Sequence, residues 1–298
     1  MNERKTMLAI DFNNILFMSY YGQPLINSRG INVNAVKSFF FRLRTFREMF
    51  EPDYIVCASD LSRAKTFRRK MYPAYKAQRG SADPNVIDQM RYASQIFALL
   101  GFQTINNEYY EADDILGMIS RLSERNDMDC VIVSSDKDLY QLVTDHTFIL
   151  SPKNSDLITK KFLVDNYQLT PEQWIELKIL QGDKGDNIPG IRGIGKITAL
   201  KLIQTYGTIE NIYDNLDKLT NKVRELLING KNDIPLMRDL VTIVTDYSYI
   251  DLTLKDIQRT KPFEVELYEL INDLEIHSLT NLMRYNLLPQ YNDKIQVY

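Results

Sequence analysis

The chain has 298 residues, 44% of them hydrophobic, with a formal net charge of −3. This composition is typical of a globular protein that buries a sizeable core, in one large domain or two smaller ones. No apolar stretch approaches the roughly eighteen residues of a membrane span, and MNERKTM at the N-terminus lacks a signal peptide's apolar segment. We therefore expect an intracellular protein without a membrane partner, in which Cys57 and Cys130 are buried, reduced thiols.

Strand and helix patterns alternate through the first half of the chain. Because this alternation is typical of βαβ units, it predicts an α/β fold with a mainly parallel central sheet flanked by helices. Right-handed crossovers would keep the carboxyl ends of the strands on one side. In chain order we expect a strand at 7–11, a helix at about 34–49, a strand at 54–59, a helix at about 85–100, a strand at about 102–106, a helix at 112–124 and a strand at 130–135.

Three of these strands end at an aspartate: MLAID at Asp11, YIVCASD at Asp60 and CVIVSSD at Asp136. Aspartate favours turns, which would account for one such ending and perhaps for two. A third makes coincidence less credible, and open α/β sheets bind ligands beyond the carboxyl ends of their strands. The sequence therefore predicts that these three carboxylates meet at one edge.

Further acidic residues follow in short motifs. Because crowded carboxylates repel and raise one another's pKa, such a cluster stays ionised only if cations neutralise it. The two histidines, His146 and His277, lie outside every acidic motif, so an oxygen-only site for Mg²⁺ or Mn²⁺ is favoured over zinc. The added acids are Glu111, Asp113 and Asp114 at the start of an apolar helix, Asp138, and Asp183 and Asp186 around Gly185.

Dividing the acidic residues by role changes the meaning of the net charge. Without the nine clustered carboxylates, 30 acidic residues remain against 36 lysines and arginines. If metal ions offset the cluster, the rest of the surface is able to attract phosphate.

The segment from 61 to about 85 is dense in basic and aromatic residues, among them Arg68, Arg69 and Tyr75. Cations that follow a backbone and rings that offer stacking faces suit single-stranded or frayed nucleic acid. An isolated charge run is more often a solvated loop, but this one directly follows Asp60 and should stand over the metal site. Lys76 and Arg79 would share a face if the segment is helical.

From about residue 160 the pattern is mostly helical, with a helix at 171–181 capped by Thr170 and another from Thr198 to Tyr206. Between them lies GIRGIGK at 190–196. Glycines allow a phosphate to approach the backbone, and free amides at the second helix can receive its charge, as in a helix-hairpin-helix. The competing interpretation is a tight turn between packed helices. Residues 255–298 carry no motif, and we expect helices packing back on the core.

These strings together resemble the bacterial and bacteriophage 5′ nuclease family, which includes the 5′→3′ exonuclease domain of DNA polymerase I and phage flap endonucleases. They occur in family order and cover most of residues 7–250. The matching motifs are AID at 9–11, YKAQR at 75–79, EADDILG at 111–117, SSDKDLYQLV at 134–143, GDKGDNIPGIRGIGKITA at 182–199 and DLVTIVTD at 239–246.

The resemblance implies a nuclease core at 1–165 with a helical arch at about 61–85, and a helical DNA-binding region at 166–298 with a helix-three-turn-helix element at about 171–206. It implies two Mg²⁺ ions, for which Mn²⁺ would substitute, and a K⁺ ion at the hairpin. The first metal would take Asp11, Asp60, Glu111, Asp113 and Asp114, and the second Asp136, Asp138, Asp183 and Asp186.

The resemblance also implies roles in substrate binding. Lys76 and Arg79 would stabilise the attacked phosphate, and Tyr75 would stack on a base. Two positions depart from the family pattern, Phe12 in place of glycine and Met18 in place of arginine, so the handling of the 5′ end is not predicted. Ser135 replaces a further glycine. The remaining substrate-binding residues would be Arg68, Arg69, Gly190, Gly193, Gly195 and Lys196.

The expected function is a metal-dependent 5′ nuclease that cleaves flapped, nicked or branched DNA, with RNA primer removal as an added activity. We expect a monomer in the cytoplasm of a bacterial cell or a phage-infected host. The alternatives are a DNA-binding protein with vestigial chemistry, a compact metal-dependent ribonuclease, and an aspartyl phosphatase using DKD at 136–138. The first would lack some of the acids, the second leaves GIRGIGK unexplained, and the third expects its motif nearer the first strand.

Overall fold

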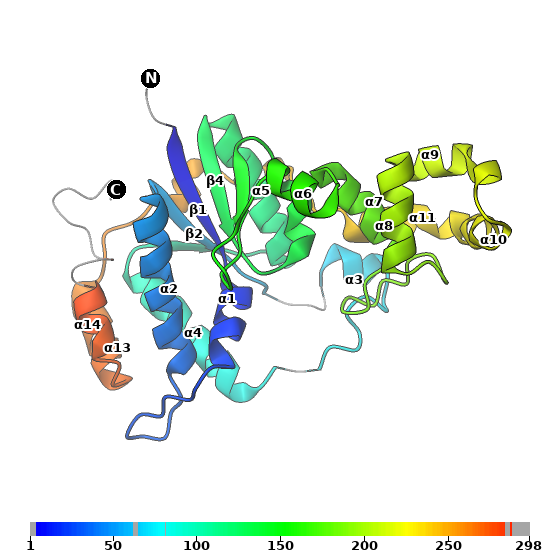
Figure 1. Ribbon diagram of the computed structural model, residues 1–298. Coiled ribbons are helices and arrows are strands. Elements are labelled where there is room, and N and C mark those ends of the chain that lie inside the picture. The colour runs from blue at the N-terminus through cyan, green and yellow to red at the C-terminus, as the bar shows by residue number, and fades with distance from the viewer. Residues whose placement is uncertain (1–3, 62–64, 81, 284–286, 288–298) are drawn as a thin grey trace.

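A computed structural model describes residues 4–61, 65–80, 82–283 and 287 (Figure 1). Its centre is a six-stranded sheet in the order β3-β2-β1-β4-β5-β6, parallel except for the antiparallel β5–β6 pair. The predicted α/β fold with a mainly parallel sheet is confirmed. The strands are β1 (Lys5–Asp11), β2 (Tyr54–Ala58), β3 (Gln103–Ile105), β4 (Met128–Val133), β5 (Thr147–Leu150) and β6 (Leu157–Ile158).

The register of the central strands sets the position of the acids. Asp11 is opposite Ala58 in β2, and Ile10 is opposite Val133 in β4. The strands β1, β2 and β4 therefore end at the same level of the sheet. Asp60 lies two residues beyond the end of β2, and Asp136 lies three residues beyond the end of β4. The four predicted strands are present. The strands β5 and β6 were not predicted, because their apolar runs are short.

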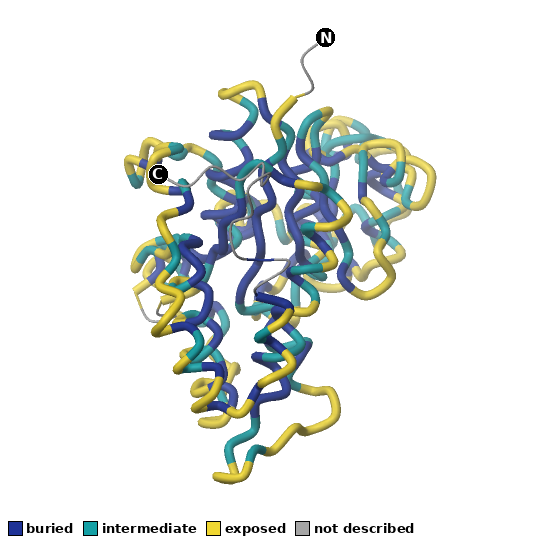
Figure 2. The backbone as a smooth tube through the Cα atoms, turned by 90° about the vertical axis from the view of Figure 1, so that its left-hand side faces the viewer, coloured by how far each residue is buried: buried dark blue, intermediate teal, exposed yellow. Residues whose placement is uncertain are grey.

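Alternate residues of β1 enter two different cores. Leu8 and Ile10 belong to a core formed with α1 (Phe12–Tyr20), α2 (Asn34–Phe50) and α4 (Pro84–Leu99). Met7 and Ala9 belong to the opposite core, under α5 (Ala112–Arg125). Figure 2 shows the strands as a buried layer between these two sets of helices. Burial on both faces explains why the strands read as continuous apolar runs.

The helical half of the molecule packs beside the α5 face of the sheet and shares its core (Figure 1). Within the described residues, no helix is long and apolar enough to cross a membrane. The helices of this half are α6 (Lys160–Tyr167), α7 (Pro171–Gln181), α8 (Lys196–Tyr206), α9 (Ile209–Asp214), α10 (Asn221–Gly230), α11 (Ile234–Val241) and α12 (Leu254–Ile257), with 3₁₀ turns at Leu216–Lys218, Lys231–Asp233 and Tyr247–Ile250. A further 3₁₀ helix, Lys137–Leu142, connects β4 to β5.

Gly117 in α5 allows the chain that follows α11 to lie directly against this helix. A Cβ atom at Gly117 would be 2.9 Å from both the Ile243 side chain and the Val244 carbonyl oxygen. No side chain fits there without displacing backbone. The glycine thus fixes a close contact between the helix that begins at Glu111 and the helical half.

The predicted arch contains one short helix, α3 (Phe67–Met71). The following residues form turns, and Lys76 has a left-handed backbone with φ +51°. Lys76 and Arg79 therefore do not share a helix face, although both reach Asp186. Residues 62–64 and 81 of the predicted arch lie outside the described residues.

The helices expected after residue 255 are present as far as they are described. The helices α13 (Glu264–Asp273) and α14 (Ser278–Leu282) pack on the α2 and α4 face. The remainder of the region expected to be helical, 284–286 and 288–298, lies outside the described residues.

Candidate metal and nucleic-acid site

A cavity of about 500 Å³ opens at the carboxyl ends of the strands. The acidic residues predicted to meet there come from both halves of the sequence, and six of the nine line the cavity. One wall also carries Lys76 and Arg79. The six acids are Asp11, Asp60, Glu111, Asp113, Asp136 and Asp186.

Local hydrogen bonds orient the carboxylates at the sheet edge. Asp11 caps α1, accepting the Asn14 amide at 3.1 Å, and also accepts the Ser134 hydroxyl at 2.8 Å. Asp60 accepts the Ala112 amide at the start of α5, at 2.8 Å. These bonds tie the ends of β1, β2 and β4 to the neighbouring helices.

Burial and mutual repulsion disfavour charge in this cavity. Burial, together with the charges of Asp60 and Asp136, raises the pKa of Asp11 to about 7. Burial also raises the pKa of Asp113 well above its ordinary value, and Asp136 and Asp11 add to the effect. A bound cation would stabilise the ionised form of such buried, crowded carboxylates.

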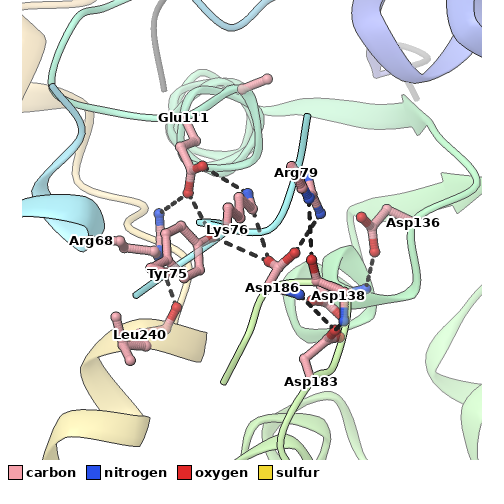
Figure 3. A network of polar contacts seen from close by, with 12 residues as sticks. Arg68, Tyr75, Lys76, Arg79, Glu111, Asp136, Asp138, Asp183, Asp186 and Leu240 are labelled. Carbon is pink, nitrogen blue, oxygen red and sulfur yellow. Dashed lines mark hydrogen bonds and ion pairs between the residues drawn. The ribbon is translucent and has the colours of Figure 1, made fainter. Parts of the chain in front are cut away.

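The pKa of Glu111 shifts in the opposite direction, because Lys76 and Arg68 contact its carboxylate. Its carboxylate accepts Lys76 Nζ at 2.7 Å, the Tyr75 hydroxyl at 2.9 Å and Arg68 Nη1 at 3.1 Å (Figure 3). Burial would raise the pKa of Glu111, but Lys76 and then Arg68 outweigh it and hold the pKa below its ordinary value. Glu111 is therefore ionised within the cavity.

The structure corrects the predicted roles of Asp114 and Arg68. Asp114 is fully buried, and its two oxygens accept Arg68 at 2.6 and 2.7 Å and the amides of Glu111 and Val244. It has no oxygen left for a metal. Arg68 is only 3% exposed, and its other donors bind Glu111 and the carbonyls of Leu240 and Thr242. All five donors of the guanidinium are used internally, so Arg68 does not bind substrate.

The structure also differs from the predicted role of Tyr75 as a residue that stacks on a base. The residue is 4% exposed, its hydroxyl lies within hydrogen-bonding distance of the Glu111 and Asp186 carboxylates, and Lys76 Nζ lies 4.8 Å from the ring centre. It cannot stack on a base in this position. Its neighbour Arg69 is half-buried and donates to the Tyr75 carbonyl.

Asp138 and Asp183 lie beside the cavity and share Lys178 of α7. Lys178 Nζ is 2.7 Å from Asp138 Oδ1 and also contacts Asp183 Oδ2. Burial and the charge of Asp136 raise the pKa of Asp138 to about 6, against the opposing effect of Lys178. At Asp183 the lysine outweighs burial and lowers the pKa. An internal cation therefore partly neutralises this second group of acids.

Asp186 faces the arch. Its carboxylate pairs with Arg79 at 2.5 Å and with Lys76 at 3.6 Å (Figure 3). Of the two arch cations predicted to face the attacked phosphate, Lys76 thus bridges Glu111 and Asp186, and Arg79 pairs with Asp186 alone.

The donor chemistry fits divalent metal ions that prefer oxygen. Six carboxylates share one cavity, and two of them, Asp11 and Asp113, have pKa values raised by burial and by the charges of neighbouring carboxylates. Yet among the residues described, no three acidic, cysteine or histidine side chains are arranged as a finished metal site. Four of the acids are instead paired with cations: Glu111 and Asp186 with Lys76 and Arg79, and Asp138 and Asp183 with Lys178.

Several lining residues were not predicted. Asn13, Asn14, Phe17 and Tyr21 come from α1, and Lys153 from the β5–β6 turn. The α1 sequence FNNILFMSY has no basic residue, and Met18, where the family pattern has arginine, lines the same wall. Within the described residues Lys153 has no hydrogen bond or ion pair, so it is the cavity's uncommitted cation.

Phe12 explains one departure from the family pattern. Its side chain is buried in the core under α1, edge-on to Phe39 with ring centroids 5.2 Å apart. It does not enter the cavity.

The predicted hairpin divides into packed and accessible positions. Gly190 is buried, and a Cβ there would lie 2.3 Å from the Gly182 nitrogen, so this glycine allows close backbone packing. Its contact with substrate stays a prediction. Gly193 is exposed with φ +90°. Gly195 is exposed with open space around it and precedes Lys196, the first residue of α8. No side chain caps this helix, so its first amides can bind an anion.

An acid-lined sheet edge beside a helical hairpin defines a metal-dependent nucleic-acid enzyme class, and comparisons place the chain within it. The model for the 5'-3' exonuclease N-terminal resolvase-like domain matches residues 6–168, and that for the 5'-3' exonuclease C-terminal SAM fold matches residues 169–265. The chain belongs to the 5'-3' exonuclease family, as its motifs predicted.

Relatives and solved structures agree with this assignment. A 5'-3' exonuclease of Aquifex aeolicus is 32% identical over 92% of this chain and 94% of its own length. DNA polymerase I of Streptococcus pneumoniae is 34% identical over 87% of this chain, which spans about a third of that relative (31%). The T5 5'-exonuclease with bound zinc has the same fold, with a TM-score of 0.68 at 21% identity, covering 91% of this chain and 99% of its own.

Proposed function

We propose that this chain is a Mg²⁺-dependent 5′ nuclease, acting as a 5′→3′ exonuclease and flap endonuclease. It cleaves flapped, nicked or branched DNA near the junction of single strand and duplex, and leaves a 5′-phosphate. RNA primers paired with DNA are a further substrate. The observation that carries the proposal is one cavity with six carboxylates facing two arch cations, next to an accessible hairpin.

Eight acids are the ligands that we assign to two divalent ions, with Mn²⁺ able to replace Mg²⁺. When bound, the ions would lower the pKa of an attacking water and neutralise charge on the phosphate and the leaving oxygen. Asp114 is excluded from the ligands by its pairing with Arg68. The first ion takes Asp11, Asp60, Glu111 and Asp113, and the second Asp136, Asp138, Asp183 and Asp186. A K⁺ ion at the hairpin remains a prediction.

The chain's own cations supply the rest of the electrostatic stabilisation. Lys76 and Arg79 lie on the cavity wall and place positive charge where negative charge develops on the reacting phosphate. Lys153, which also lines the cavity and has no ion pair among the described residues, is available to bind a neighbouring phosphate. Asn13 and Asn14 add neutral hydrogen-bonding groups on the α1 wall.

The hairpin holds the duplex through its backbone. Gly193 and Gly195 leave the main chain accessible, and the uncapped start of α8 offers amides to a phosphate. Contacts of this kind fix the position of a duplex without reading its sequence. The enzyme would therefore recognise the shape of its substrate.

Relatives support DNA as the substrate. One solved neighbour is the T5 D15 flap endonuclease in a pseudo-enzyme-product complex with DNA and metal ions, and another is the catalytic core of Rad2 in complex with a DNA substrate. Two neighbours of similar fold contain metal ions. We infer that this chain acts on DNA as a monomer in the cytoplasm of a bacterial cell or a phage-infected host.

The test is incubation with a 5′-labelled flap, with and without Mg²⁺, and mapping of the product ends. Cleavage at the junction that needs Mg²⁺ and leaves a 5′-phosphate is the expected result. Asp136→Asn should abolish it, while Asp145→Asn, which alters an exposed aspartate paired with Lys160, should leave it intact.

Two other results would point to the alternatives. Binding of the flap without cleavage in Mg²⁺ or Mn²⁺ would indicate a DNA-binding protein with vestigial chemistry. Cleavage of an RNA strand of the same sequence, but not of the DNA strand, would indicate a ribonuclease. Cleavage unaffected by Asp136→Asn would contradict the proposed mechanism itself.

A further inference from the structure

Two segments far apart in the sequence lie against each other at the wall of the cavity. Residues 74–79 belong to the arch, and residues 183–187 lead into the hairpin; Figure 3 shows Lys76 and Arg79 beside Asp186. The backbone amide of Lys76 donates to the Asp186 carbonyl at 2.9 Å. The arch is thus hydrogen-bonded through its main chain to the other family region.

Two amide side chains hold this contact from either side of Lys76. Asn187 Nδ2 donates to the Ala74 carbonyl at 2.8 Å, across 113 positions of sequence. Gln78 Nε2 donates to the carbonyls of Lys184 at 3.0 Å and Gly185 at 3.1 Å. Within the described residues, neither side chain hydrogen-bonds to a cavity carboxylate.

The backbone of Lys76 requires such support. Its φ of +51° lies in the left-handed region, which a lysine rarely adopts without a surrounding structure that enforces it. In this conformation the side chain is only 12% exposed and places Nζ 2.7 Å from Glu111. A relaxed backbone would point the ammonium elsewhere.

The 183–187 loop is itself firmly held. The amide of Asp183 donates to the Ile188 carbonyl at 2.8 Å, and the Ile188 amide returns a bond to Asp183 at 2.7 Å. Gly182 and Gly190 then pack backbone to backbone. The loop is therefore a rigid extension of the hairpin.

We propose that Gln78 and Asn187 are positioning residues: their amides hold Lys76 in its left-handed conformation, aim its ammonium at the reacting phosphate and link it to the hairpin. The inference rests on the proposed function, because Lys76 acts on the phosphate only in a nuclease.

The variants remove the side-chain amide hydrogen bonds while changing the backbone as little as possible. Asn187→Gly removes the amide but keeps the positive φ of +58° accessible, and Gln78→Ala removes the second pair of bonds. Gln204→Ala is the matched control, because Gln204 also donates its amide to a backbone carbonyl, that of Tyr167, away from the cavity.

Cleavage is measured in single turnover at saturating enzyme, and affinity with Ca²⁺ in place of Mg²⁺. We expect each variant to lose about tenfold in rate, as for one hydrogen bond that acts at the transition state. Affinity for the flap and the melting temperature should match those of the Gln204→Ala control. A purely structural role would lower the melting temperature instead.

A double-mutant cycle shows whether the residues act through Lys76. Asn187→Gly should cost little or nothing in a Lys76→Ala background, because the group that it positions is gone. An undiminished tenfold loss in that background overturns the proposal. So does an unchanged cleavage rate in both single variants.

Acylation of Lys76 by an amine reagent, read by mass spectrometry, tests the same contact without any catalysis. Lys76 should be protected in the native chain and should react several-fold faster in Asn187→Gly, whereas the Gln204→Ala control should match the native chain. Unchanged labelling in the variants overturns the proposal. If the native chain cleaves no flap at all, the proposed nuclease function fails, while the labelling result still decides whether these amides hold Lys76.

Discussion

Arg68 and Asp114 form a buried, two-pronged ion pair, with Nη1 to Oδ2 at 2.6 Å and Nη2 to Oδ1 at 2.7 Å. The planar guanidinium group forms two parallel hydrogen bonds to the carboxylate, and a lysine cannot form this bidentate arrangement. The pair joins α3 of the arch to α5, and Arg68 also binds the carbonyls of Leu240 and Thr242 at the C-terminal end of α11.

Arg68→Ala should destabilise the fold strongly. Removing one partner leaves a buried carboxylate unpaired, at a cost of about 3–5 kcal/mol in the free energy of unfolding. Urea denaturation measures this. Arg91→Ala, which breaks an exposed pair with Asp88, is the control and should cost about 1 kcal/mol or less. Equal stability of the two variants would contradict the buried pair.

The neighbouring aspartates Asp113 and Asp114 should respond in opposite ways to asparagine. Asp114→Asn disturbs the pair with Arg68, so we expect a loss of stability. Asp113→Asn removes a crowded carboxylate from the cavity, so we expect a weaker response to Mg²⁺ with stability kept. Denaturation curves and Mg²⁺ titrations of cleavage separate the two. A fully stable Asp114→Asn with weakened Mg²⁺ dependence would restore Asp114 as a ligand.

Lys76 should affect the rate of cleavage, whereas Lys153 should affect substrate binding. Lys76→Ala should lower turnover about a hundredfold, because it removes charge at the reacting phosphate, and should change duplex binding much less. Rates at saturating substrate and binding titrations compare the two effects. Equal losses in rate and binding would contradict the role given to Lys76.

Lys153→Ala should instead weaken binding. Loss of one phosphate contact reduces the slope of log affinity against log salt by about 0.7 to 0.9. Titrations at several salt concentrations measure this slope, with Lys161→Ala, an exposed lysine of α6 outside the cavity, as the control. An unchanged slope would remove Lys153 from the substrate contacts.

Leucine substitutions at the two exposed hairpin glycines should differ in their effect on the stability of the fold. Gly195→Leu meets open space, so we expect weaker duplex binding at normal stability. Gly193→Leu requires a positive φ and meets Leu226 at 3.0 Å, so binding and stability should both fall. Binding titrations and melting curves test the contrast. Normal duplex binding by Gly195→Leu would count against the hairpin as the duplex site.

The sequence predicted the sheet and the position of the acids because both depend on local patterns. Asp11, Asp60 and Asp136 meet because parallel strands that end in register present their next residues at one edge. The helix at 112–124 was predicted almost to its bounds, since a strong apolar stripe follows its acidic first turn.

Side-chain partners could not be predicted in the same way. Arg68 looked like a substrate residue because its motif is basic, and only the fold brings it to Asp114, 46 positions away. Lys153 carries no motif, and its place depends on the turn after the unpredicted strand β5. The left-handed backbone of Lys76 depends on contacts with residues 183–187, which local sequence does not reveal.

Gly117 has a consequence for cooperativity. The contact of α5 with Ile243 and Val244 leaves no gap, and the apolar core beneath it draws on both family regions. We therefore expect the two regions on either side of residue 168 to unfold together, so that thermal denaturation shows one transition. Because Glu111 is the N-cap of α5 and Asp113 lies in its first turn, a disturbance that loosens the distant helices would also shift these two carboxylates.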